Sequence, residues 1–126
     1  MKYKYKNLEP LGRHLKDCVC RAISNSTNER YETIERKLYL IGELYDCEQL
    51  CVACYYNLLE NYYNYTRVKG VHGMTIREFA NTHPYGNYII RIDGHLTSVK
   101  NGILEDIWDC SDEIIDIVWE EPIVNW

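Results

Sequence analysis

The dipeptide Asn101-Gly102 separates two short runs that are rich in β-branched and apolar residues. Asn-Gly is a strong signal for a two-residue type I′ hairpin turn, because both turn residues must adopt positive φ. The register that follows pairs Lys100 with Ile103, Val99 with Leu104, Ser98 with Glu105, Thr97 with Asp106, Leu96 with Ile107 and His95 with Trp108. The sequence therefore predicts a β-hairpin over residues 95–108.

This register gathers polar side chains on one face of the hairpin. Side chains alternate along a strand, so one face carries His95, Thr97, Asp106 and Trp108. Asp106 is then the diagonal neighbour of His95, at a Cα separation of roughly 7–8 Å that an imidazole and a carboxylate can bridge. Asp109 points to the opposite face, but a slip of one residue would exchange the two aspartates. Asp109 is therefore the alternative carboxylate partner of His95.

Cys18 lies in the segment Asp17–Ser24, whose pattern is typical of the entry to a short helix. The unpaired N–H groups and the dipole at a helix N-terminus favour a thiolate there. A nucleophilic thiol also needs a base, and that base needs a group that orients it. Cys18, His95 and Asp106 are candidates for these roles. The segment alone also allows Cys18 to be a buried apolar residue, as we expect for Cys20 on another side of the helix.

Five short runs together carry a resemblance to a known family. They are residues 17–24 (DCVCRAIS), 75–80 (TIREFA), 83–88 (HPYGNY), 94–97 (GHLT) and 106–109 (DIWD). In this order, over most of the chain, they resemble small papain-like cysteine-peptidase-fold proteins of bacteriophages and of mobile elements of Gram-positive bacteria. The resemblance implies a papain-like (cysteine proteinase) fold, with N-terminal helices packed on a C-terminal antiparallel sheet. It also implies a catalytic triad of Cys18, His95 and Asp106.

The chain departs from the papain-like pattern in one respect. Such enzymes usually place a glutamine a few residues before the nucleophile, where its amide helps a backbone N–H to bind the oxyanion. No glutamine precedes Cys18, and the nearest upstream amide is that of Asn7. Asn7 is therefore the candidate second oxyanion donor, provided that the intervening loop folds it back.

The remaining pattern predicts one α+β domain over residues 1–126, since helices precede strands. The expected helices run from the first turn at Cys18, from about Asn28 to Tyr45, from about Asp46 to Tyr63, and from a Thr75 cap to about Asn81. The expected strands are about Tyr88–Ile92, His95–Lys100, Ile103–Trp108 and Ile114–Trp119, with Met1–Lys6 as an edge strand and Thr66–Gly73 as a loop.

Charge and hydropathy narrow the expected partners. The net charge of −5 argues against a general electrostatic footprint for nucleic acid. No apolar stretch approaches the ~20 residues of a membrane span, and the N-terminus lacks a signal-peptide pattern. We therefore expect a cytoplasmic protein that binds neither nucleic acid nor membrane, located in a bacterial host cell if it is phage-encoded.

Six cysteines in a chain of 126 residues raise the question of disulfides or a metal. A cytoplasmic location favours free thiols. Cys47, Cys51 and Cys54 have the CxxxCxxC spacing of some iron–sulfur sites, but in a helix they would line one apolar stripe. Core packing is therefore the favoured interpretation, and a zinc or cluster site completed by Cys110 or His72 is the alternative. We expect no metal and no cofactor.

Together these features predict a papain-like cysteine hydrolase or acyl transferase that acts on a peptide or amide bond. Its substrate would be a peptide, a protein or another amide, including a host protein. The alternative is a catalytically inactive papain-fold module that binds a host protein or a small molecule. The absent glutamine and the small size favour that alternative.

Overall fold

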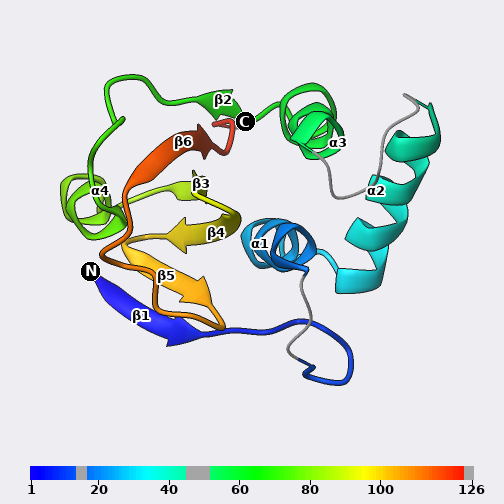
Figure 1. Cartoon of the computed structure of the whole chain (residues 1–126), viewed down its shortest axis with the longest axis horizontal. Helices are drawn as coiled ribbons and strands as arrows, with labels where there is room; N and C mark the ends of the chain where they lie inside the picture. Colours follow the sequence, from blue (N-terminus) through cyan, green and yellow to red (C-terminus); the bar gives the residue numbers. More distant parts are fainter. Residues whose placement is uncertain (14–16, 45–51, 124–126) are drawn as a thin grey trace.

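The computed structural model describes residues 1–13, 17–44 and 52–123. In these residues the chain is an α+β structure, in which four α-helices pack on a six-stranded mixed sheet (Figure 1). The helices are α1 (Cys18–Thr27), α2 (Tyr31–Leu44), α3 (Val52–Asn57) and α4 (Ile76–Thr82), and a π-helical turn, η1 (Leu58–Tyr62), follows α3. The strands are β1 (Lys2–Tyr5), β2 (Thr66–Arg67), β3 (Asn87–Ile92), β4 (His95–Lys100), β5 (Ile103–Asp106) and β6 (Ile115–Glu120).

The sheet has the strand order β1-β5-β4-β3-β6-β2. The predicted edge position of the N-terminal strand is confirmed, but β1 runs parallel to β5. The expectation of an antiparallel sheet is therefore wrong at this edge. The chain between β1 and β5 passes through the helices, and such a long crossover permits parallel pairing. Strand β2, which pairs with β6, replaces part of the expected loop after Thr66.

The predicted hairpin is present, and its first three pairs have the predicted register. Asn101 and Gly102 have φ of 50° and 75°, as a type I′ turn requires. The ladder ends at the pair of Ser98 and Glu105, so the predicted pairs from Thr97 to His95 are wrong. Strand β5 ends at Asp106, whose carboxylate accepts the backbone N–H of Ile107 at 2.7 Å.

Two apolar cores lie on the two faces of the sheet. Helix α1 packs on one face, with α2 beyond it and α3 beside it near β6 and β2, and α4 lies against the other face (Figure 1). The first core includes Ile23, Ile34, Leu58, Leu96 and Trp119. The second includes Phe79, Ile90, Val99, Leu104 and Val118. Side chains alternate between the two faces along β3 and β4, so both strands contribute residues to both cores and are buried along most of their length.

The helix limits follow local signals. Helix α2 begins at Tyr31 rather than Asn28, because Asn28 has a φ of 62° and ends α1 in the left-handed region. Thr75 caps α4 through a capping box with Glu78, as predicted. The helix expected from Asp46 is described only from Val52, since residues 45–51 lie outside the described part of the chain. None of the described helices is long and apolar enough to cross a membrane.

Candidate active site

Cys18 is the first residue of α1, as the sequence predicts. The first intrahelical hydrogen bond runs from the Arg21 N–H to the Asp17 carbonyl, at 3.1 Å. The Asp17 side chain makes no capping hydrogen bond; it pairs with the Arg21 guanidinium and accepts the Tyr31 hydroxyl. The N–H groups of the first turn have no acceptor within the helix, so their partial positive charge lies beside the Cys18 thiol.

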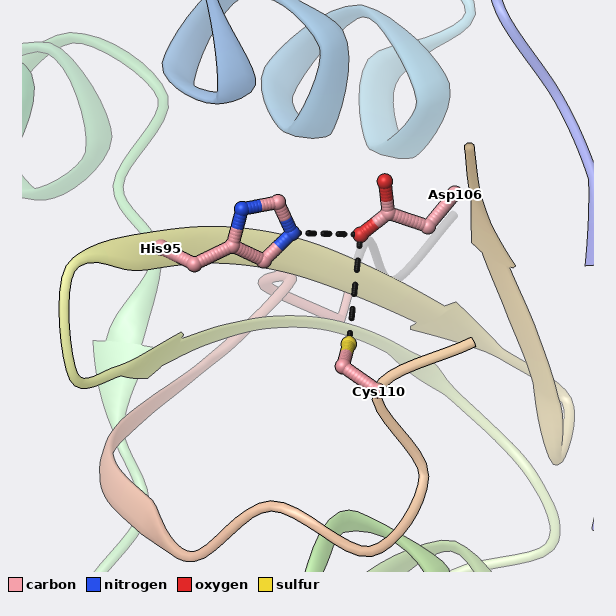
Figure 2. Close-up of side chains that lie close together, drawn as sticks. All are labelled: His95, Asp106 and Cys110. Carbon is pink, nitrogen blue, oxygen red and sulfur yellow. Dashed lines mark hydrogen bonds and ion pairs between the residues drawn. The ribbon is translucent and has the colours of Figure 1, made fainter. Parts of the chain in front are cut away.

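His95 and Asp106 meet at the end of the sheet. His95 begins β4 directly after Gly94, which has a φ of 68°, and Asp106 is the last residue of β5. The His95 Nε2 lies 2.7 Å from the Asp106 Oδ2 (Figure 2). The side chains of His95 and Asp106 are only 13% and 4% exposed, so water screens this pair weakly.

The Asp106 carboxylate is fixed by further donors. The Thr97 hydroxyl donates to Oδ2 at 2.6 Å, and the Ile107 N–H donates to Oδ1 at 2.7 Å. Thr97 follows His95 by two residues, so strand alternation turns both side chains to the same side. The carboxylate is therefore held in one orientation, with one oxygen directed at the imidazole.

Cys18 and His95 interact from two different layers of the fold. Burial alone would raise the pKa of Cys18, but the hydrogen bond with His95, the backbone hydrogen bond of Leu96 and the charge of His95 bring it below its ordinary value. Burial alone would lower the pKa of His95, but hydrogen bonds with Asp106, Cys110 and Cys18 raise it to about 11. These opposite shifts favour a thiolate and an imidazolium at neutral pH.

The two imidazole nitrogens have different surroundings. Nε2 is directed at Asp106, whereas Nδ1 is turned to the side on which α1 lies (Figure 2). Hydrogen bonding through one nitrogen fixes the role of the other. The ring can therefore exchange a proton with Cys18 through Nδ1 while Asp106 orients it through Nε2.

Trp108 lies edge-on to the His95 ring, with 5.0 Å between the ring centroids. The sequence places both residues on one face, and their contact is present although the expected ladder pair is not. Trp108 is 44% exposed, so its indole forms part of the surface beside the imidazole.

The other two predicted residues, Asp109 and Asn7, form hydrogen bonds with residues other than His95. Asp109 is exposed, and its carboxylate accepts hydrogen bonds from the backbone and the hydroxyl of Ser111. The Asn7 amide donates to the Arg13 carbonyl at 2.9 Å and accepts the Glu9 N–H at 3.1 Å. These bonds hold Asn7 within its own loop, and its oxyanion role stays a prediction.

Cys110 is the site residue that sequence reasoning missed. It is buried, and its Sγ lies 4.0 Å from the Asp106 Oδ2 (Figure 2). It reaches this place because the loop turns at Trp108, whose carbonyl accepts the Cys110 N–H at 3.0 Å. Cys110 follows Asp106 by four residues in the sequence. This spacing brings the two side chains together only because β5 ends at Asp106 and the chain then turns back.

The three-cysteine pattern is described only in part. Cys54 is fully buried and takes part in a disulfide, which departs from the expectation of free thiols. Cys20 is 2% exposed within the first core, as predicted. The prediction for Cys47 and Cys51 falls outside the described residues.

Comparisons with known protein families, with curated proteins and with solved structures found no match.

Proposed function

We propose that this chain is a papain-like cysteine hydrolase or acyl transferase with the triad Cys18, His95 and Asp106. One observation carries the proposal: the His95 imidazole interacts with the Cys18 thiol and with the Asp106 carboxylate. In this arrangement Cys18 is the nucleophile, His95 the base and Asp106 the group that orients the base, which are the three roles that covalent catalysis by a thiol requires.

The reaction that we propose begins with the Cys18 thiolate attacking the carbonyl carbon of an amide. The C–N bond then breaks, and the His95 imidazolium gives its proton to the leaving nitrogen. The acyl group stays on Cys18 as a thioester. Neutral His95 next takes a proton from water, or from an acceptor amine, and the oxygen or nitrogen so activated displaces the Cys18 thiolate. Asp106 holds the ring in place through both steps.

The oxyanion that forms at the carbonyl oxygen needs hydrogen-bond donors. In our proposal the backbone N–H of Cys18 is one donor, because it belongs to the first turn of α1. Asn7 is not assigned as the other, since its amide is engaged by Arg13.

The proposed substrate is a peptide, a protein or another amide, with a host protein as one such target. The exposed part of Trp108 offers an apolar surface for a side chain or main chain beside the imidazole. Neither nucleic acid nor membrane is a proposed partner, and the proposed location is the cytoplasm.

A peptide library with a carboxy-terminal aldehyde tests this function. An aldehyde forms a reversible hemithioacetal with a catalytic thiolate, so binding is measured as protection of Cys18 from alkylation while the aldehyde is present. We expect at least one library pool to protect Cys18 in the wild type. We expect none to do so in His95→Ala, whereas His83→Ala should behave as the wild type because His83 stacks on Phe79 in α4, outside the site.

The second candidate is a catalytically inactive binding module, and the engagement of Asn7 within its own loop favours it. The two candidates differ in the effect of Cys18→Ala. A binding module keeps its affinity for a captured host protein in this variant, and the captured protein stays intact with the wild type. An enzyme cleaves or acylates the captured protein, and Cys18→Ala abolishes that change.

A further inference from the structure

The side chains of His95, Asp106 and Cys110, which offer three different ligand atoms, meet at the Nε2 edge of the imidazole. The His95 nitrogen, an Asp106 carboxylate oxygen and the Cys110 sulfur all lie within 4.8 Å of one another (Figure 2). We propose that His95, Asp106 and Cys110 bind a zinc ion. This site does not use Cys18, so the inference stands independently of the proposed catalytic role.

The ligand set matches the chemistry of zinc. Zn²⁺ binds imidazole nitrogen, carboxylate oxygen and thiolate sulfur at about 2.0–2.3 Å, whereas Mg²⁺ and Ca²⁺ prefer oxygen ligands alone. Ligand atoms in a tetrahedral site are therefore roughly 3.3–3.7 Å apart. Here Nε2 and Oδ2 are 2.7 Å apart, and Sγ and Oδ2 are 4.0 Å apart. Shifts of well under 1 Å for each side chain would therefore be needed.

Charge balance also favours a divalent cation. A neutral imidazole, a carboxylate and a thiolate together carry two negative charges, which Zn²⁺ neutralises. Asp106 and Cys110 are only 3% and 1% exposed. Burying charges costs less free energy when they sum to zero than when they are unbalanced. On binding, His95 Nε2 and the Cys110 thiol each release one proton to solvent.

The surroundings already orient the carboxylate without the ion. Thr97 donates to the Asp106 Oδ2 at 2.6 Å and the Ile107 N–H donates to Oδ1 at 2.7 Å. Such outer hydrogen bonds hold metal ligands in place. With three protein ligands, a water molecule completes a four-coordinate site.

Zinc would take over the Nε2 and Oδ2 atoms that join His95 to Asp106. Zinc-bound protein would then lack the hydrogen bond that orients the imidazole. The ion would in this way switch off the triad, a consequence that rests on the proposed function.

The test uses the full chain, freed of metal with a chelator and titrated with Zn²⁺ against a chromophoric chelator. We expect the wild type and Cys18→Ala to bind one equivalent at the site. We expect Cys110→Ala and His95→Ala to lose that equivalent, or to bind it at least ~100-fold more weakly. Cys20→Ala is the matched control, because Cys20 is a buried cysteine in the other core.

Co²⁺ provides a second measurement that identifies the sulfur ligand. A thiolate-to-cobalt charge-transfer band should form in Cys18→Ala and be absent from the double variant Cys18→Ala, Cys110→Ala. No zinc equivalent in the wild type, or one that survives unchanged in folded Cys110→Ala, would overturn the site. Failure of the proposed hydrolase would leave these results unchanged, because zinc binding is also measured in Cys18→Ala, which has no catalytic thiol.

Discussion

The carboxylate of Asp106 receives donors from the His95 ring, the Thr97 hydroxyl and the Ile107 N–H. Asp106, at the end of β5, therefore contacts the side chains of His95 and Thr97 on β4. Asp109, three residues later, has a carboxylate of the same type that is exposed and engaged with Ser111. The two residues form a matched pair for testing which aspartate supports the imidazole.

We predict that Asp106→Asn slows alkylation of Cys18 by iodoacetamide at pH 6.5 by about tenfold or more. The neutral amide removes the negative charge that stabilises the imidazolium, and a loss of one pKa unit corresponds to a tenfold change. In Asp109→Asn, Cys18 should be alkylated at the wild-type rate. Peptide mapping by mass spectrometry measures the rate at Cys18, and circular dichroism checks the fold of each variant. Equal rates for both variants would contradict the assignment of Asp106.

Strand alternation and the turn favoured Asp106 over Asp109 in the sequence, and His95 does contact Asp106, although the ladder pairs from Thr97 to His95 are not formed. The role of Cys110 was not accessible in this way. It depends on the chain leaving the sheet after Asp106, where the Asp106 carboxylate accepts the Ile107 N–H, and the residue pattern did not predict this exit.

The β4–β5 hairpin is the element that places His95 and Asp106 together. Its turn has positive φ at both Asn101 and Gly102. A Cβ on Gly102 would meet the Pro84 carbonyl at 3.7 Å, an ordinary contact, so substitution there changes backbone conformation rather than packing.

We predict that Gly102→Ala lowers the free energy of unfolding by about 1–2 kcal/mol, because a residue with a Cβ is strained at this φ. Gly102→Asn should recover most of the loss, since asparagine tolerates the left-handed region. Urea unfolding curves measure both variants. A cost for Gly102→Asn as large as that for Gly102→Ala would instead indicate a steric conflict at the turn.

Sequence patterns predicted elements better than pairings. The Thr75 capping box, the start of α1 and the type I′ turn each depend on a few adjacent residues, and all three are present. The parallel pairing of β1 with β5 depends on where the whole intervening chain passes. Because neighbouring residues do not record that path, the mixed sheet was not predictable from local patterns.

Across the whole molecule, the candidate site joins two distant parts of the chain. Cys18 lies on the helix that packs on the sheet, and His95 lies on a strand of the sheet (Figure 1). Each residue was predictable as a candidate from its own segment, but their contact depends on the packing of α1 against β4. The shifted pKa values of both residues follow from this packing.

The central claim is that the fold pairs the Cys18 thiol with the His95 imidazole. The sign of the pH effect follows from the two shifts. Because its pKa is lowered, Cys18 is a thiolate at lower pH than an ordinary thiol. Because its pKa is raised, His95 stays charged at higher pH than an ordinary imidazole. An unpaired thiol, with a pKa near 8.5, loses about tenfold of its thiolate for each pH unit below that value.

The most direct measurement is the rate of Cys18 alkylation by iodoacetamide from pH 5 to 9, with chelator present, in the wild type and in His95→Ala. We predict that the rise of the wild-type rate lies at lower pH than that of His95→Ala. The wild-type rate should exceed that of His95→Ala by roughly tenfold at pH 6.5, after allowance for the lower nucleophilicity of a low-pKa thiolate. Both proteins should behave alike in urea, where the pairing is lost. A wild-type rate that rises only towards pH ~8.5, with the same profile in His95→Ala, would contradict the pairing of Cys18 with His95.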